Sequence, residues 1–286
     1  MIEPRWLIFG AATPGLIAAA AFAATAWRRP ALSTVAWALA LALAWPVGHY
    51  VTVGLPHAPW NVGENWLLPL ALLTALVAAI PWPTWWGGTT ARALLLAGIC
   101  YAMMQPAIVW VWSVPQTVAW VGGSALMASG ITEAVVLLGR GRAGRELPVG
   151  LALTAFVTGV VCAMSSSLTI GQFGLLLGAI TAGAGLAAFW LPCDKAPRGA
   201  PAVVMPMLLA VILYGTHSAD VHLRVAVLLL AAPVMMWAGE LPFIKRRPRL
   251  VVAAVRLVAL LVPLAVALAL VVPDFIDAIN SPYSGY

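Results

Sequence analysis

Apolar residues occur along the chain in runs of about twenty, and short polar connections separate these runs. A helix needs about 20 apolar residues, at roughly 1.5 Å each, to cross about 30 Å of hydrocarbon. The runs lack the alternating pattern of membrane-spanning strands. The sequence therefore predicts an all-α, polytopic integral membrane bundle of about ten transmembrane helices, at about 6–27, 31–53, 66–82, 91–112, 116–139, 147–164, 168–191, 201–216, 221–241 and 250–273.

Charge decides two of the divisions that hydropathy leaves open. Connections that lack lysine and arginine, at 54–65, 113–116, 165–167 and 217–220, alternate with connections that carry them. Loop basicity marks the cytoplasmic side of a membrane, so this alternation predicts turns at 113–116 and 165–167. The lysine and arginine residues in or beside the basic connections are Arg28, Arg29, Arg92, Arg140, Arg142, Arg145, Lys195, Arg198, Lys245, Arg246, Arg247 and Arg249.

Composition and charge agree with this class and give an orientation. Hydrophobic residues make up 63% of the chain and charged residues 8%, against about a quarter charged in soluble domains. The pattern predicts a multi-pass protein of a bacterial cytoplasmic membrane with both termini outside the cytoplasm. The net charge of +6 is then a topology signal, so the expected partners are the lipid bilayer and other membrane proteins or further copies of the chain, and not nucleic acid.

One transmembrane domain is expected over residues 1–286, because no linker or soluble segment interrupts the apolar runs. Ten spans divide as five plus five, which suggests inverted halves at 1–139 and 147–286, as in many secondary transporters. The length and ten-span plan resemble those of the drug/metabolite transporter superfamily. Members of that family keep both termini in the cytoplasm, which this charge pattern does not predict, so the chain is not assigned to it.

The histidines all fall at the ends of spans that are predicted to face outward. Imidazole and carboxylate groups together bind divalent metals or exchange protons. The stretch YGTHSADVHLR is the most polar run, and His217, Asp220 and His222 are its candidate metal ligands. A solvated polar turn and haem ligation are the alternatives, and no other cofactor is expected. The outward-facing polar residues are His49, His57, Glu64, His217, Asp220 and His222.

Three ionisable residues lie within predicted spans, where an unpaired charge is costly and often functional. They are Glu133, Glu240 and Arg256, all in the third of the membrane nearest the basic loops. An ion pair between Arg256 and either glutamate would satisfy both charges. Alternatively, each side chain snorkels to the interface. Glu133 is the strongest functional candidate, because it follows a run of small and hydroxylated residues, which permit close helix packing. That run and the glycines of span 168–191 suggest that these two spans are central.

The sequence does not predict an enzyme, because it contains no H-E-x-x-H, G-x-S-x-G or P-loop motif. Span count, the prolines within seven spans and a few intramembrane charges favour a secondary transporter or permease for a small solute or ion. A non-catalytic membrane subunit of a larger complex is the alternative. An outer-face metal-binding or haem-binding membrane protein is the third possibility.

Overall fold

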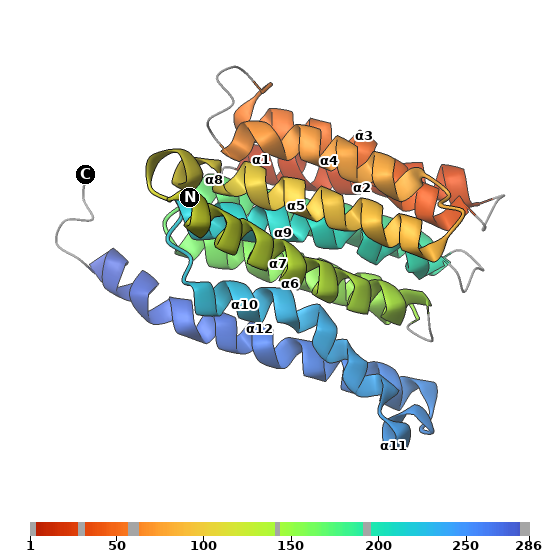
Figure 1. Cartoon of the computed structure of the whole chain (residues 1–286). Coiled ribbons are helices and arrows are strands. Elements are labelled where there is room, and N and C mark those ends of the chain that lie inside the picture. Colours follow the sequence, from red (N-terminus) through yellow and green to blue (C-terminus); the bar gives the residue numbers. More distant parts are fainter. Residues whose placement is uncertain (1–3, 28–31, 57–62, 141–143, 191–195, 281–286) are drawn as a thin grey trace.

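A computed structural model describes residues 4–27, 32–56, 63–140, 144–190 and 196–280, and this part of the chain is helical nearly throughout. Figure 1 shows the long helices aligned side by side as one bundle. Their bounds are α1 Pro4–Trp6, η1 Leu7–Ala12, α2 Thr13–Ala26, α3 Ser33–Val53, α4 Gly63–Ala79, α5 Trp85–Trp110, α6 Val114–Arg140, α7 Glu146–Met164, α8 Leu168–Trp190, η3 Ala196–Gly199, α9 Ala200–Ser218, α10 Leu223–Met235, η4 Met236–Glu240, α11 Pro242–Lys245 and α12 Arg249–Asn280.

The helices follow the predicted segments closely. Within the described ranges, nine helical segments are long and apolar enough to cross a membrane, and α4, with 17 residues, is a shorter apolar helix. Helices α7 and α8 are divided at 165–167, as the charge pattern predicted, and α5 and α6 are divided at 111–113, which begins two residues before the turn predicted at 113–116. The protein is thus an all-helical bundle compatible with a multi-pass membrane protein.

The bundle has two chemically different ends. One, which we call the histidine end, carries His49, His217 and His222. The other, which we call the basic end, carries Arg140, Arg145 and the connection that leads into α12. The first and last helices both reach the histidine end, since Arg5 shares a pocket with Leu168 there and Asp274 shares another with His222. An even number of crossings requires this arrangement.

Helix α9 forms the centre of the bundle. It contacts α3, α4, α5, α6, α7, α8 and α10, and every residue from Ala200 to Gly215 is buried. In contrast, α6 lies at the periphery, and a Cβ atom added to Gly122, Gly123 or Gly130 would meet nothing within 4 Å. The expectation that α6 is central was therefore wrong. Ala125, Ala128 and Thr132 of its small-residue run are buried against the bundle, but the glycines of the run face away from it.

Helices α7 and α8 touch backbone to backbone near the histidine end. A Cβ atom on Gly174 would lie 2.5 Å from the Cα of Gly159, and one on Gly159 would lie 2.6 Å from the nitrogen of Leu175. Real Cβ atoms do not approach this closely, so the crossing requires glycine at both positions. Such close approach, mediated by small residues, is typical of helix packing in membranes.

Candidate functional site

Histidine 49 is a structural residue in this fold. Its ring is fully buried and packs against Phe173 at 5.5 Å between ring centroids. Its Nδ1 lies 3.1 Å from the carbonyl oxygen of Gly54, and its Nε2 lies 3.1 Å from that of Glu64. Both ring nitrogens are therefore engaged, and the residue joins the end of α3 to the start of α4.

The other polar residues of the histidine end do not converge on one point. His222 is 66% exposed and lies 3.8 Å from an oxygen of Asp274. Asp220, which has a φ of 52°, shares a cavity with His222 and Asp274, whereas His217 lines a different cavity. Within the described ranges, no three histidine, cysteine, aspartate or glutamate side chains are grouped so that they could hold a metal ion. His57 lies outside these ranges.

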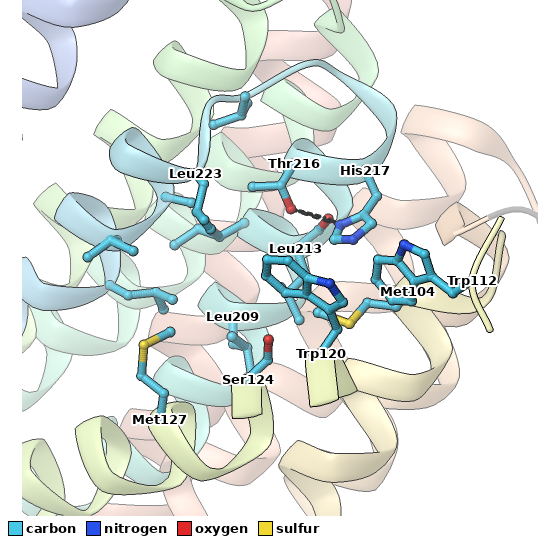
Figure 2. A pocket seen from close by; sticks show the side chains of 15 residues that line it. Met104, Trp112, Trp120, Ser124, Met127, Leu209, Leu213, Thr216, His217 and Leu223 are labelled. Atoms are coloured by element: carbon cyan, nitrogen blue, oxygen red, sulfur yellow. Dashed lines mark hydrogen bonds between the residues drawn. The ribbon is translucent and has the colours of Figure 1, made fainter. Parts of the chain in front are cut away.

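His217 instead belongs to an apolar pocket of about 210 Å³ at the histidine end, between α5, α6, α9 and α10. Figure 2 shows His217 close to Trp112 and Trp120, with Met104 nearby and Met127 further along the pocket. The lining residues are Met104, Trp112, Trp120, Ser124, Met127, Leu209, Ile212, Leu213, Thr216, His217, Val221, Leu223, Ala226, Val227 and Leu230.

Local structure fixes the aromatic part of the pocket. Helix α5 ends at Trp110, and Gln116 then accepts hydrogen bonds from the Ser113 backbone nitrogen and hydroxyl, which holds the tight connection to α6. Trp112 in this connection stacks on Trp120 of α6, with centroids 6.0 Å apart and planes 16° apart. Offset stacking of this kind is a favourable aromatic geometry, so the two indoles form one continuous apolar wall.

The imidazole of His217 faces this wall. Its centroid lies 5.9 Å from that of Trp112, edge to face at 79°. Nδ1 lies 2.9 Å from the hydroxyl of Thr216 and 3.0 Å from the carbonyl oxygen of Leu213, one helical turn earlier. These contacts orient the ring and occupy Nδ1. Nε2 is consequently the nitrogen that can hydrogen-bond to a molecule in the pocket.

The pocket opens sideways, between α6 and α10. Met127 and Trp120 on α6 are 43% and 48% exposed, and Leu223 and Val227 on α10 are 59% and 42% exposed. Only His217 among the 15 lining residues can carry a charge. A cation bound here would lose hydration without gaining an opposite charge, and an anion would gain one only from a protonated His217. The pocket therefore suits a neutral, largely apolar molecule with a group that can hydrogen-bond.

Glu133 is held in an ion pair at the other half of the bundle. Its two carboxylate oxygens accept from Arg92, Oε1 from Nε at 2.6 Å and Oε2 from Nη2 at 3.0 Å. The hydroxyl of Thr89 donates to Oε2 at 3.3 Å. Glu133 thus ties α6 to α5. The sequence had suggested Arg256 as a partner for Glu133, but the partner is Arg92. It lines neither the pocket of His217 nor the cavity of Asp220.

Arg256 forms the second buried cluster, near the basic end. Its side chain, 2% exposed, donates from Nη1 to Glu146 of α7 and from Nη2 to Glu240 of η4. Lys245 also pairs with Glu240, at 3.0 Å. A Cβ atom on Gly239 would lie 2.5 Å from Cγ of Arg256, so this glycine leaves the space through which the side chain passes. The cluster joins α7, η4 and α12.

Sequence reasoning placed Glu240 beside Arg256 as one alternative but did not identify Arg92 and Glu146 as partners. Arg92 was interpreted as one of the basic residues beside a connection, and Glu146 was not singled out. Their partners come from segments 41 and 110 residues away, a distance over which a single sequence carries no pairing signal. Trp112 and Trp120 gave no sequence signal of a pocket, because tryptophan is common at membrane interfaces whether or not a pocket is present.

No protein-family model, curated protein or solved structure matches this chain.

Proposed function

We propose that the protein is a transporter or permease of the cytoplasmic membrane and that its substrate is a small, uncharged aromatic or amphipathic molecule bound at His217, Trp112 and Trp120. The pocket between α6 and α10 carries this proposal. It combines a stacked indole wall, one imidazole nitrogen and apolar walls, with an opening toward lipid. Ligand sites are typically apolar cavities with a few polar groups that fix orientation.

Contacts join α6 to its neighbours at the basic end but leave a pocket between α6 and α10 at the histidine end, and this supports an opening that can widen by helix movement. Toward the basic end, Arg92 and Glu133 tie α5 to α6, and Trp237 donates to the carbonyl oxygen of Ala134 at 3.0 Å, which ties η4 to α6. At the histidine end, the pocket separates α6 from α10. Pro106 within α5 and Pro233 within α10 each remove a backbone hydrogen bond. Bending at these positions would widen the opening while the basic end stays joined.

Binding of three matched probes to the purified full-length protein tests the substrate class. Indole is neutral, whereas indole-3-acetate and tryptamine carry the same ring with a negative or a positive charge. Because the pocket holds no carboxylate and one basic side chain, His217, we expect indole to bind at least tenfold more tightly than either charged analogue at about pH 8, where imidazole is ordinarily neutral, as measured by equilibrium dialysis. Equal or tighter binding of a charged analogue would contradict the proposal.

A substitution that fills the pocket provides the second arm. Ser124→Phe places a ring inside the cavity, whereas Ala119→Phe adds the same ring to an exposed position of the same helix. We expect the first variant to abolish indole binding and indole uptake by proteoliposomes, and the second to leave both unchanged. Indole binding that survives Ser124→Phe would place the ligand elsewhere.

A non-catalytic subunit of a larger membrane complex is the second candidate, and α6 favours it. Ala119, Gly123, Leu126 and Gly130 lie exposed along this helix, and the two glycines have open space beside them. Small residues on an exposed membrane helix permit a partner helix to approach closely. Gly123→Leu and Gly130→Leu would then release a partner or dissociate an oligomer, as measured by native mass spectrometry of protein from membranes, without altering indole binding.

A further inference from the structure

A second apolar groove runs along the outside of the bundle, between α7 and α8 at the basic end. It has a volume of about 270 Å³, and its lining residues come from the first half of α7 and the second half of α8. Arg145 lies at its mouth, and Phe156 and Thr181 lie at its far end. It shares no lining residue with the pocket of His217.

The glycine crossing of α7 and α8 explains why the groove stops where it does. Beyond the groove, toward the histidine end, Gly159 and Gly174 bring the two backbones into contact. At the boundary, the ring of Phe156 lies against Gly178, so that a Cβ atom there would be 2.7 Å from the ring. The helices therefore meet backbone to backbone in the half nearest the histidine end. Toward the basic end they meet through side chains, with Pro148 3.2 Å from a Cβ atom on Gly185, and the groove follows the outside of this contact.

The groove is polar at one end only. The guanidinium carbon of Arg145 lies 4.7 Å from the ring centroid of Phe189, a cation–π contact that holds the charge over the mouth. Thr181 is fully buried at the other end, but its hydroxyl donates to the carbonyl oxygen of Leu177 at 2.7 Å. Between them the walls are formed by apolar side chains such as Val149, Leu153 and Leu186.

The length of the groove matches one leaflet of a membrane. From Arg145 to Phe156 the helix advances eleven residues, or about 16 Å at 1.5 Å per residue. One leaflet contributes about half of the roughly 30 Å hydrocarbon core. An acyl chain that begins at Arg145 would thus reach the middle of the bilayer where the groove ends.

Among the residues that the structure describes, no carboxylate forms an ion pair with Arg145, so its charge is available to a ligand. The adjacent carboxylate, Glu146, is bonded to Arg256 and so is directed into the bundle. Basic pockets between transmembrane helices on the cytoplasmic side bind anionic lipid head groups. An arginine recognises a phosphate oxygen pair through two parallel hydrogen bonds, which gives geometry as well as charge.

We propose that this groove is a binding site for an anionic phospholipid of the leaflet at the basic end. The phosphate binds Arg145 and one acyl chain lies between α7 and α8. The lipid covers apolar surface that the helices leave open there and bridges the start of α7 to the end of α8. The site stands independently of the proposed transport function, because it lies on other helices and uses other side chains.

Native mass spectrometry of the delipidated full-length protein tests the site, with phosphatidylglycerol and phosphatidylcholine as matched probes. When the two lipids are added at equal concentration, we expect at least one phosphatidylglycerol to bind, with an affinity at least tenfold higher than that of phosphatidylcholine. Arg145→Gln should remove this preference, and Arg145→Lys should retain part of it. Arg140→Gln is the control, because it removes an exposed charge of the same end that does not line the groove.

A second variant tests the acyl chain. Ala182 lines the groove and is partly exposed, so Ala182→Phe fills the space from the lipid side. We expect this variant to lose the tightly bound lipid although Arg145 is intact, and inorganic phosphate at millimolar concentration not to displace the lipid from the wild type. Unchanged lipid binding in both Arg145→Gln and Ala182→Phe, or displacement by phosphate alone, would overturn the proposal.

Discussion

Arg92 of α5 donates hydrogen bonds to both carboxylate oxygens of Glu133 on α6, and Thr89 donates a third to the same carboxylate. A two-point arginine–carboxylate contact is strong and directional. Arg92 is buried, and the side chain of Glu133 is 20% exposed. This pair connects α5 to α6, so its loss should affect the stability of the bundle first.

Neutralising Glu133 should destabilise the protein. Glu133→Gln leaves the guanidinium of Arg92 without its opposite charge, and we expect a loss of about 2 kcal/mol in the free energy of unfolding, less than for a fully buried pair. Asp274→Asn is the matched control, because Asp274 and His222 form an exposed contact worth little. Unfolding by SDS titration in mixed micelles measures both. Equal stabilities for the two variants would contradict a structural role for the pair.

Arg256 should be the most sensitive charged residue of the chain. Arg256→Gln removes the buried cation that bonds both Glu146 and Glu240, and we expect a loss of about 3–5 kcal/mol. Lys245→Gln should cost far less, because Lys245 is 44% exposed and Glu240 keeps its bond to Arg256.

A triple substitution separates charge from packing at this cluster. Arg256→Met combined with Glu146→Gln and Glu240→Gln removes every buried charge at once, and such replacements are often neutral or stabilising. We expect the triple variant to recover most of the stability that Arg256→Gln loses. If the triple variant is as unstable as Arg256→Gln, the cluster stabilises the bundle through the packing of the arginine side chain and not through charge balance.

Replacing glycine by alanine should have opposite effects at the crossing of α7 and α8 and on the open face of α6. Gly174→Ala forces a Cβ atom into the backbone of α7, and we expect a loss of several kcal/mol, comparable to overpacking a core. Gly123→Ala on α6 meets open space and should raise helix stability by up to about 1 kcal/mol. Thermal unfolding in detergent distinguishes them, and a stable Gly174→Ala would show that α7 and α8 separate easily.

Sidedness is a prediction from the charge pattern that a labelling experiment tests. In a variant whose native cysteines are replaced by serine, a cysteine at Ser113 should react with an impermeant thiol reagent added to intact cells. A cysteine at Phe243, an exposed residue of α11, should react only after permeabilisation. The reverse pattern would put the histidine end in the cytoplasm, and the lipid groove at the basic end would then lie in the outer leaflet.

The helices were predictable because each follows from local physics. A run of about twenty apolar residues satisfies its backbone hydrogen bonds only as a helix in lipid, and the alternation of basic connections located the turns at 113 and 165–167. Packing was less predictable. The glycines of α8 marked a real contact with α7, but those of α6 did not, since composition reports what a helix face permits and not what occupies it. Similarly, the pairing of Glu133 with Arg92 depends on α5 and α6 lying side by side, which the sequence alone does not show.

The enclosed position of α9 also constrains how the protein is made. This helix is synthesised eighth, yet six of the seven helices around it precede it in the chain. In the finished bundle those six helices surround α9. Before α9 is made, they cannot all hold their final positions without leaving an apolar gap among them, and α9, followed by α10 and α12, fills this gap. A ribosome stalled before residue 200 would leave a half-assembled bundle with an apolar slot, open to lipids or to the cell's membrane chaperones.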